Sequence, residues 1–257
     1  MKYFVVADVH GFYNEMIQAL NKAGFDKSNP NHILVSLGDA LDRGTQPHEV
    51  LQFLMSLPKE RRILIRGNHE DLMEDAITRG YFLKHDRSNG TRNTALALTG
   101  ASNDWDALIQ MRTHPLYNAY IRACIDYYET DKYIFVHGWI PHNVYDKGFN
   151  CDYKCHDYVA RWRDADKYRW EMARWYNGME SWADGVREPD KTIFCGHWHT
   201  SWARCYINRT LSNEWTENPA AFKTWCADGI VALDACTAHS HFVNCYMIED
   251  EPLPKAE

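Results

Sequence analysis

The chain has 257 residues, of which 45% are apolar, and it carries a formal net charge of −7. This length suits one α/β domain over residues 1–257, with no separate linker, because glycine and proline are scattered along the chain. An acidic chain without a run of Lys or Arg excludes an extended nucleic-acid-binding face, because the phosphate backbone requires clustered positive charge.

The first apolar run, residues 3–7, ends at the acidic Asp8. It is too short for a signal peptide or a membrane span, so we expect a soluble, cytoplasmic protein with no membrane partner. In such a chain the eight cysteines are expected to remain reduced thiols. Four lie in apolar or strand-like surroundings and are interpreted as core residues: Cys195, Cys226, Cys236 and Cys245. A zinc site at Cys151, Cys155 and His156 is a weaker alternative, because no second ligand pair follows them.

Apolar runs alternate with helical periodicity in the first third of the chain. Strands are predicted at residues 3–7, 33–37 and 62–65, and helices at residues 12–20 and 50–57. This βαβαβ pattern predicts an α/β fold with largely parallel strands. Later strands are predicted at residues 133–136, 192–195, 230–233 and 242–248. The insertions between them, residues 79–130 and 142–190, are expected to be helical or irregular and to cover one edge of the site.

Polar segments directly follow five of these strands. They are residues 8–11, 38–44, 67–70, 137–138 and 196–199. Ligands of open α/β sheets bind beyond the carboxyl ends of the strands, so these segments are expected to meet at one rim. Asp, His and Asn are the donors of a catalytic transition-metal pair.

Asp8 and His10 are expected to reach one ion together, because residues i and i+2 of an extended segment point to the same side. The two oxygens of Asp39 suit a carboxylate that bridges two ions. The Gly-Asp-x-x-Asp-Arg-Gly motif at residues 38–44 would occur by chance in roughly one chain of this length in ten thousand.

With these motifs together, the sequence resembles the calcineurin-like metallophosphoesterases. The resemblance is to their phosphoprotein phosphatase branch, which includes bacteriophage lambda phosphatase and the bacterial diadenosine tetraphosphatases. It covers residues 8–199 and extends to Leu233-Asp234-Ala235-Cys236, where Ala-Cys replaces the common Thr-Gly. The resemblance implies a mixed β-sandwich flanked by helices, with two divalent ions, manganese first and iron or zinc as alternatives.

The resemblance also implies a ligand set. Asp8 and His10 would hold the first ion, Asp39 would bridge, and Asn68, His137 and His197 would complete the second site. His199 is assigned to the first ion, with a role beside the ligands or facing the substrate as its alternative.

Two ions would activate a water for attack on phosphorus and neutralise the phosphoryl oxygens. His69 is the predicted general acid for the leaving oxygen, and Asp42 would orient it. Arg43 would clamp the phosphate with its planar donor fork. The family places a second arginine late in the chain, and Arg174 is the best match. Its competitors are Arg161, Arg163 and Arg169.

Glu70 and the aromatic segment 158–182 each allow a structural interpretation as well as a functional one. Glu70 is expected to fix its loop by accepting backbone hydrogen bonds rather than to bind metal. The segment 158–182 is rich in Trp and Tyr, which indicates a helical lid packed on the core; a wall that stacks a nucleobase or holds a phosphopeptide is the alternative.

The motifs favour a metal-dependent phosphomonoesterase of the serine/threonine phosphoprotein phosphatase type. The alternative is a nucleotide hydrolase that acts on dinucleoside polyphosphates or cyclic nucleotides. The partner is accordingly a phosphorylated protein or a small phosphate ester. A metal-binding scaffold without activity is disfavoured, because His69, Asp42 and Arg43 accompany every ligand.

Overall fold

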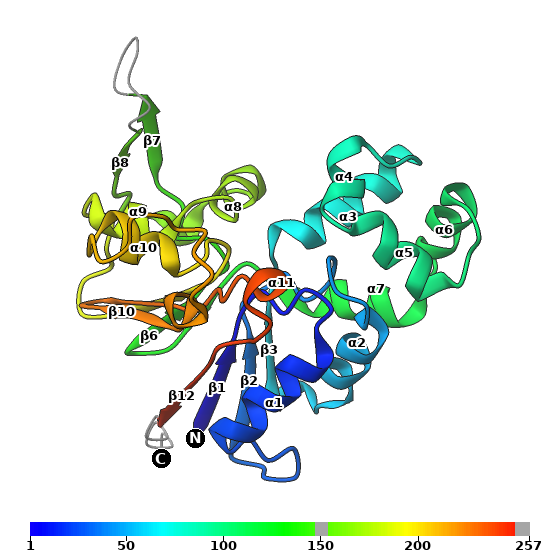
Figure 1. Ribbon diagram of the computed structural model, residues 1–257, viewed down its shortest axis with the longest axis horizontal. Helices are drawn as coiled ribbons and strands as arrows, with labels where there is room; N and C mark the ends of the chain where they lie inside the picture. Colours follow the sequence, from blue (N-terminus) through cyan, green and yellow to red (C-terminus); the bar gives the residue numbers. More distant parts are fainter. Residues whose placement is uncertain (147–153, 250–257) are drawn as a thin grey trace.

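The computed structural model describes residues 1–146 and 154–249 and contains two five-stranded sheets (Figure 1). The first sheet has the order β12-β1-β2-β3-β4, in which β1 to β4 are parallel and β12 is antiparallel to β1. Its strands, in that order, are Cys245–Glu249, Lys2–Val6, His32–Ser36, Arg62–Ile65 and Cys124–Ile125.

The second sheet has the order β10-β11-β9-β6-β5, with three parallel central strands and an antiparallel strand at each edge. Its strands, in that order, are Trp225–Ala227, Ile230–Ala232, Thr192–Cys195, Tyr133–Phe135 and Tyr128–Glu129. A separate hairpin of β7 (Asn143–Asp146) and β8 (Lys154–Asp157) projects from the body near α8 and α9 (Figure 1).

The alternation of side chains along β1 shows how the layers are held. Val5 packs in the cluster that joins the two sheets, which also contains Phe135 of β6 and Phe194 of β9. Phe4 and Val6 belong to the cluster on the opposite face, which contains the helices. β1 is buried on both faces, so its sequence is a continuous apolar run.

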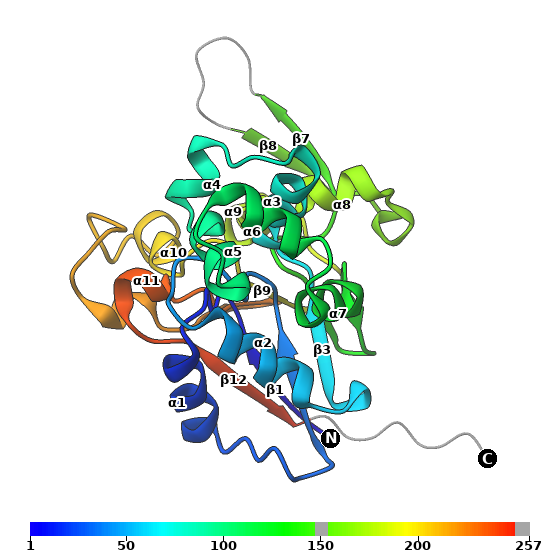
Figure 2. The same ribbon diagram turned by 90° about the vertical axis from the view of Figure 1, so that its right-hand side faces the viewer.

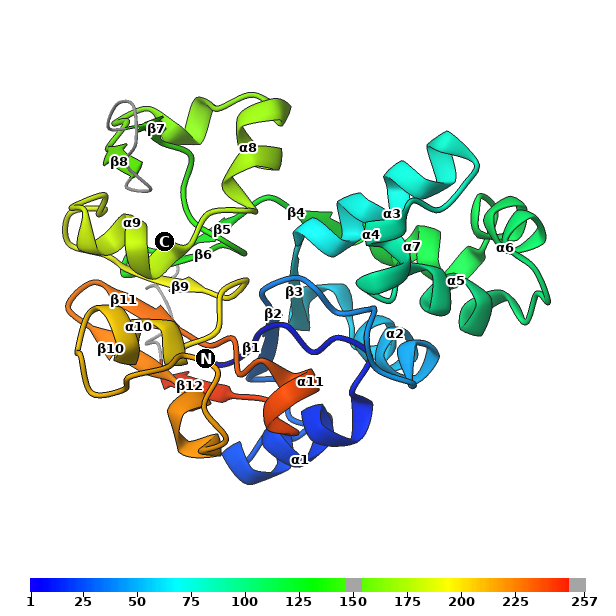
Figure 3. The ribbon, with the colours of Figure 1, turned by 45° about the horizontal axis from the view of Figure 1, so that its top comes forward.

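Helices cover the outer face of each sheet. In Figure 2, α1 and α2 lie over the first sheet, and α1 contacts β1 and β12. Figure 3 shows α2 to α7 gathered on one side and α8 to α10 on the other. The helices α1 to α11 span Tyr13–Ala23, Pro47–Ser56, Asn68–Arg79, Lys84–Ser88, Thr91–Thr99, Asp104–Met111, Pro115–Ala123, Lys167–Ala173, Gly178–Ala183, Ser201–Tyr206 and Thr237–Ser240. Short 3-10 turns occupy Lys59–Arg61, Trp162–Asp164 and Pro219–Phe222.

The predicted mixed sandwich flanked by helices is confirmed, and most predicted strands lie within one residue of the observed ones. The last strand begins at Cys245 rather than at residue 242, and the preceding Asn244 is held by side-chain hydrogen bonds to the carbonyls of Phe222 and Leu233. The core assignment of Cys226 is wrong. It is exposed, because its neighbour Trp225 takes the inward position of β10.

The expectations of reduced cysteines and of an alternative zinc site concern residues that the structure describes only in part. Six cysteines are free thiols: Cys124, Cys195, Cys205, Cys226, Cys236 and Cys245. The zinc alternative includes Cys151, which lies outside the described residues. Within the described ranges, no helix combines the length and apolar character needed to cross a membrane.

Candidate metal centre

Loops that follow strands of both sheets meet at one place in the structure. The N–H of His10 donates to the carbonyl of Asp39 at 2.9 Å, which joins the loops after β1 and β2. The N–H of His197, after β9, donates to both Asp8 carboxylate oxygens at 3.1 and 3.0 Å. The His137 ring, after β6, bonds to the carbonyl of Leu37. The sandwich therefore delivers ligands from two sheets to one centre.

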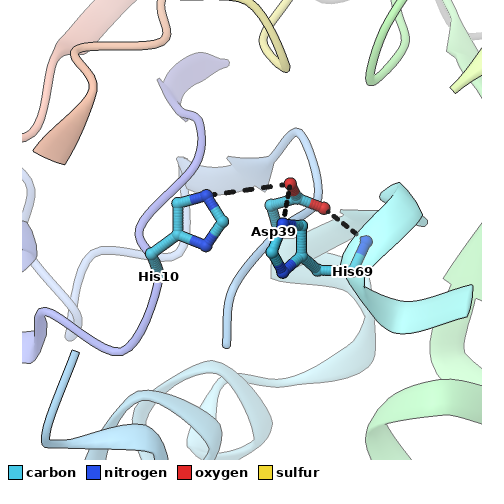
Figure 4. Close-up of side chains that lie close together, drawn as sticks. All are labelled: His10, Asp39 and His69. Atoms are coloured by element: carbon cyan, nitrogen blue, oxygen red, sulfur yellow. Dashed lines mark hydrogen bonds and ion pairs between the residues drawn. The ribbon is translucent and has the colours of Figure 1, made fainter. Parts of the chain in front are cut away.

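Two clusters of donor atoms share Asp39. The first group consists of His10, Asp39 and His69, and the second of Asp39, His137 and His197. In the first group, the Nε2 atoms of His10 and His69 each lie 3.8 Å from Oδ2 of Asp39 (Figure 4). In the second group, Nε2 of His137 lies 3.4 Å from Oδ1 of Asp39. One carboxylate thus serves both groups, as a bridging ligand would.

The ring nitrogens of the histidines are oriented as metal ligands are. Nδ1 of His10 donates to the carbonyl of Leu41 at 2.9 Å, and Nδ1 of His137 donates to that of Leu37 at 2.7 Å. A carbonyl only accepts, so Nδ1 carries the proton and Nε2 of each ring faces the centre. Nε2 of His137 is also 2.8 Å from the side-chain oxygen of Asn68. Nε2 of His197 is buried and has no hydrogen-bond partner among the described residues.

Burial keeps two of these rings neutral. It lowers the pKa of His10 well below its usual value, and it lowers the pKa of His197 to about 3. A neutral imidazole has a free lone pair, which is the form that binds a metal ion. An orphaned buried nitrogen beside a carboxylate therefore fits a cation.

Three buried carboxylates crowd the same centre. Burial raises the pKa of Asp8, and the nearby charges of Asp234 and Asp39 raise it further. Burial likewise raises the pKa of Asp234 to about 6. Burial alone would raise the pKa of Asp39, but the surrounding histidines lower it. Divalent cations would relieve this repulsion, and the mixed nitrogen and oxygen donors fit transition metals. The sequence assigned Asp234 no role, although Asp234 follows β11 and lies in the segment 233–236 to which the resemblance extends.

The backbone at the centre is held in an unusual conformation. Of ten non-glycine residues with positive φ among those described, seven lie in these loops. They are Asp8, His10, Asp39, Asp42, Arg43, His197 and Cys236. Such strain persists where surrounding structure enforces it, and it gathers at functional sites.

The extended-segment argument for Asp8 and His10 is wrong, because both have φ 50° and the chain turns between them. The Asp8 carboxylate instead accepts from the His197 N–H, and it lies so close to Gly196 that a side chain at residue 196 would collide with it. Its predicted role as a ligand of the first ion stays a prediction.

His69 forms a short chain of hydrogen bonds leading away from the centre. Its Nδ1 lies 2.8 Å from Oδ2 of Asp42, which also accepts from the Thr91 hydroxyl at 2.7 Å. Burial alone would lower the pKa of His69, but the Asp39 and Asp42 carboxylates outweigh it and raise that pKa. Arg43 is exposed, and its Nη2 lies 3.4 Å from Nε2 of His69. Sequence reasoning missed Thr91, which begins α5 in an insertion that carries no motif.

Glu70 fixes the loops rather than facing the centre, as expected. Its carboxylate accepts the backbone N–H groups of Asp39, Ala40 and Gly67 at 3.0, 3.1 and 2.8 Å, and the hydroxyl of Tyr120 at 3.0 Å. It therefore ties the loop after β2 to the start of α3.

The structure brings neither His199 nor Arg174 to the two groups. Nδ1 of His199 bonds to the Ser201 hydroxyl at 2.6 Å, and its ring packs on Trp215. The Arg174 guanidinium pairs with the carboxylates of Asp71, at 2.6 Å, and Asp126. The predicted roles of His199 and Arg174 stay predictions that these contacts do not support.

The aromatic segment divides into two kinds of residue. Trp162 and Trp170 are buried in the core outside the second sheet, as the lid interpretation predicted. Trp175 is exposed, and its ring centroid lies 5.7 Å from that of His197. Only the second kind borders the centre.

The sequence matches the family profile of calcineurin-like phosphoesterases over residues 1–242. The chain belongs to this family. It is therefore a metal-dependent phosphoesterase, as the sequence predicted.

The chain is also similar to three individual proteins. The symmetrical bis(5'-nucleosyl)-tetraphosphatase of Proteus mirabilis is 26% identical over 88% of this chain and 77% of its own length. That of Buchnera aphidicola is 30% identical over 118 residues, 46% of this chain, and the match spans only 39% of its length. A cold-active protein-tyrosine phosphatase of a psychrophilic Shewanella shares the fold, with a TM-score of 0.57 and 16% identity over 97% of this chain and 75% of that one.

Proposed function

We propose that this phosphoesterase hydrolyses the anhydride bonds of dinucleoside polyphosphates with two divalent ions. The observation that carries the catalytic part is the sharing of Asp39 between two groups of donors, all buried except the half-buried His197. The choice of substrate is supported by relatives along most of the chain that are named bis(5'-nucleosyl)-tetraphosphatases.

In this proposal each ion has its own ligands. The first would be held by Asp8 and His10, the second by Asn68, His137 and His197, and Asp39 would bridge them. Bound there, the ions would supply positive charge for the phosphoryl oxygens and acidify a water. We omit His199, whose ring faces Ser201 and Trp215 instead.

The other steps belong to the side chains around the ligands. The exposed guanidinium of Arg43 would bind two oxygens of the phosphoryl group that is attacked. His69 would donate the proton on Nε2 to the leaving oxygen, because its Nδ1 is held by Asp42. The carboxylates of Asp39 and Asp42 raise the pKa of His69 by more than burial lowers it, which favours the protonated ring. Thr91 would fix Asp42, because the Thr91 hydroxyl donates to Oδ2 of Asp42, the same oxygen that bonds to Nδ1 of His69.

Phosphoserine or phosphothreonine hydrolysis in proteins is the second candidate. The Gly-Asp-x-x-Asp-Arg-Gly motif at residues 38–44 favours it. Both reactions use the same centre, so substrate preference separates them.

The deciding experiment compares manganese-loaded protein on diadenosine tetraphosphate, a phosphopeptide, a cyclic nucleotide and p-nitrophenyl phosphate. We expect the highest kcat/KM for diadenosine tetraphosphate, with EDTA abolishing and manganese restoring the activity. A clear preference for the phosphopeptide would overturn the substrate assignment, and full activity in metal-free protein would overturn the mechanism.

The role of His69 is tested by His69→Asn, with the exposed His48→Asn as its control. We expect intact metal content, a loss of roughly 10²–10⁴ on alkyl phosphates and a smaller loss on p-nitrophenyl phosphate, whose leaving group needs little protonation. Equal losses on both substrates would remove His69 from the acid role.

A further inference from the structure

Two exposed tryptophans stand beside the same histidine of the metal centre. Trp175 is 48% exposed, and its ring meets that of His197 edge to face, at 5.7 Å and 82°. Trp198 is 36% exposed, with its ring centroid 5.9 Å from that of His197. Large apolar rings left in water next to a buried polar centre indicate a surface that a ligand covers.

Trp175 also lines a cavity of about 590 Å³. Leu72 and Ile125 contribute apolar walls, and Thr78, Asp75 and Glu171 contribute oxygens. This volume lies in the range of small-molecule sites. Trp175 therefore borders both the metal centre and a cavity large enough for a nucleoside.

The charge of the cavity decides which part of a substrate it accepts. Five carboxylates line it against three basic side chains. All three bases are already paired: Arg66 lies 2.6 Å from Asp71, Arg174 bridges Asp71 and Asp126, and Lys167 lies 3.5 Å from Glu171. Such a lining repels phosphates, but its oxygens accept hydrogen bonds from ribose hydroxyls and base amino groups.

We propose that Trp175 and this cavity bind one nucleoside of the substrate, with the base stacked on the Trp175 indole. The uncharged nucleoside enters the acidic cavity, while the polyphosphate stays at Arg43 and the two groups. Trp198 adds a second indole surface beside His197. This assignment rests on the proposed function, because it presumes a substrate that carries a base.

The test pairs two substrates that share the anhydride bond and differ in the base. Diadenosine tetraphosphate carries adenosine, and inorganic tripolyphosphate does not. In Trp175→Ala we expect kcat/KM for diadenosine tetraphosphate to fall about 5- to 150-fold, mainly through KM, the range that base stacking provides. Activity on tripolyphosphate should change less than about twofold, because its binding does not use the indole.

Three variants serve as controls for this result. Trp175→Phe retains a stacking ring and should recover most of the loss. Trp105→Ala removes a 65% exposed tryptophan from α6, and it should change neither substrate. Thr78→Trp fills the cavity and should raise KM for diadenosine tetraphosphate alone.

Equal losses on both substrates in Trp175→Ala, or no loss on diadenosine tetraphosphate, would overturn the nucleoside site. A wild type that cleaves tripolyphosphate but not diadenosine tetraphosphate would instead overturn the proposed function. Calorimetry with adenosine 5'-phosphate then decides the nucleoside site without turnover: binding that Trp175→Ala weakens supports it, and equal or absent binding refutes it.

Discussion

Replacing Glu70 by Gln tests how the loops around Asp39 are held. The carboxylate is buried and accepts four hydrogen bonds, two at each oxygen. Oε2 accepts from the N–H groups of Asp39 and Gly67, and Oε1 accepts from the N–H of Ala40 and the hydroxyl of Tyr120. Glutamine has only one oxygen, so at least one donor loses its acceptor.

The cost follows from the better of the two amide orientations. With nitrogen at the Oε2 position, two backbone N–H groups would be orphaned. With nitrogen at the Oε1 position, the Tyr120 hydroxyl can turn and accept, so only the Ala40 N–H is left unpaired. A buried, unpaired N–H costs roughly 1–3 kcal/mol. Burial raises the pKa of Glu70, so replacing the buried carboxylate by a neutral amide removes a desolvation cost and offsets part of this penalty. We therefore expect the free energy of unfolding to fall by roughly 1–2 kcal/mol.

Glu74→Gln is the matched control, one helical turn further along α3. Glu74 also accepts a tyrosine hydroxyl, that of Tyr117 at 3.0 Å, and a glutamine oxygen can replace it there. Its cost should stay within about 0.5 kcal/mol. Urea unfolding of the metal-free proteins measures both, and manganese content should fall only in Glu70→Gln. Equal stabilities of the two variants would refute the anchoring role.

Two further substitutions test the centre and the pH dependence of stability. Gly196→Ala would drive a methyl group into the Asp8 carboxylate and should lower manganese content. Gly185→Ala strains the backbone at φ 94° but meets no neighbouring atom, so it should leave manganese content unchanged. Equal manganese contents in the two variants would contradict the role of the Asp8 contact. Burial lowers the pKa of His142 to about 4, so stability is fully present above its unfolded value near 6.5 and is lost as pH falls toward 4. Between pH 7 and 5 this loss is about 2 kcal/mol. Urea unfolding at pH 7 and pH 5 should show a smaller loss of the free energy of unfolding in His142→Gln than in the wild type, and an unchanged loss in His48→Gln. The same dependence of that free energy on pH in the wild type and both variants would contradict the assignment.

The sequence sufficed for the strands whose burial is continuous. β1 and β2 are covered on both faces, so apolar runs mark them within one residue. The short edge strands escaped prediction: β4 and β5 have two residues each, and β10 has three. Their pairing depends on a neighbouring strand rather than on a periodic pattern of their own.

The candidate site was predictable as a set of loops but not as a set of side-chain directions. His10, Asp39, His137 and His197 meet, because they follow strands whose carboxyl ends share one edge of the sandwich. The sequence did not predict that the His199 side chain points away from the two groups. His197 adopts a positive φ, so the chain turns there and residue 199 continues toward α10.

The side-chain directions of Asp8 and His199 could not be predicted from local sequence for the same reason that backbone strain is concentrated in the loops of the metal centre. A left-handed residue other than glycine costs on the order of 1 kcal/mol, so short-range preferences do not predict Asp8, Asp39 or His197 in that conformation. The buried sandwich and the Glu70 anchor impose it. The orientation of the donors is therefore a property of the whole fold, and the same loops without the two sheets would not hold the centre. Weakening the anchor should consequently reduce metal occupancy before it unfolds the protein.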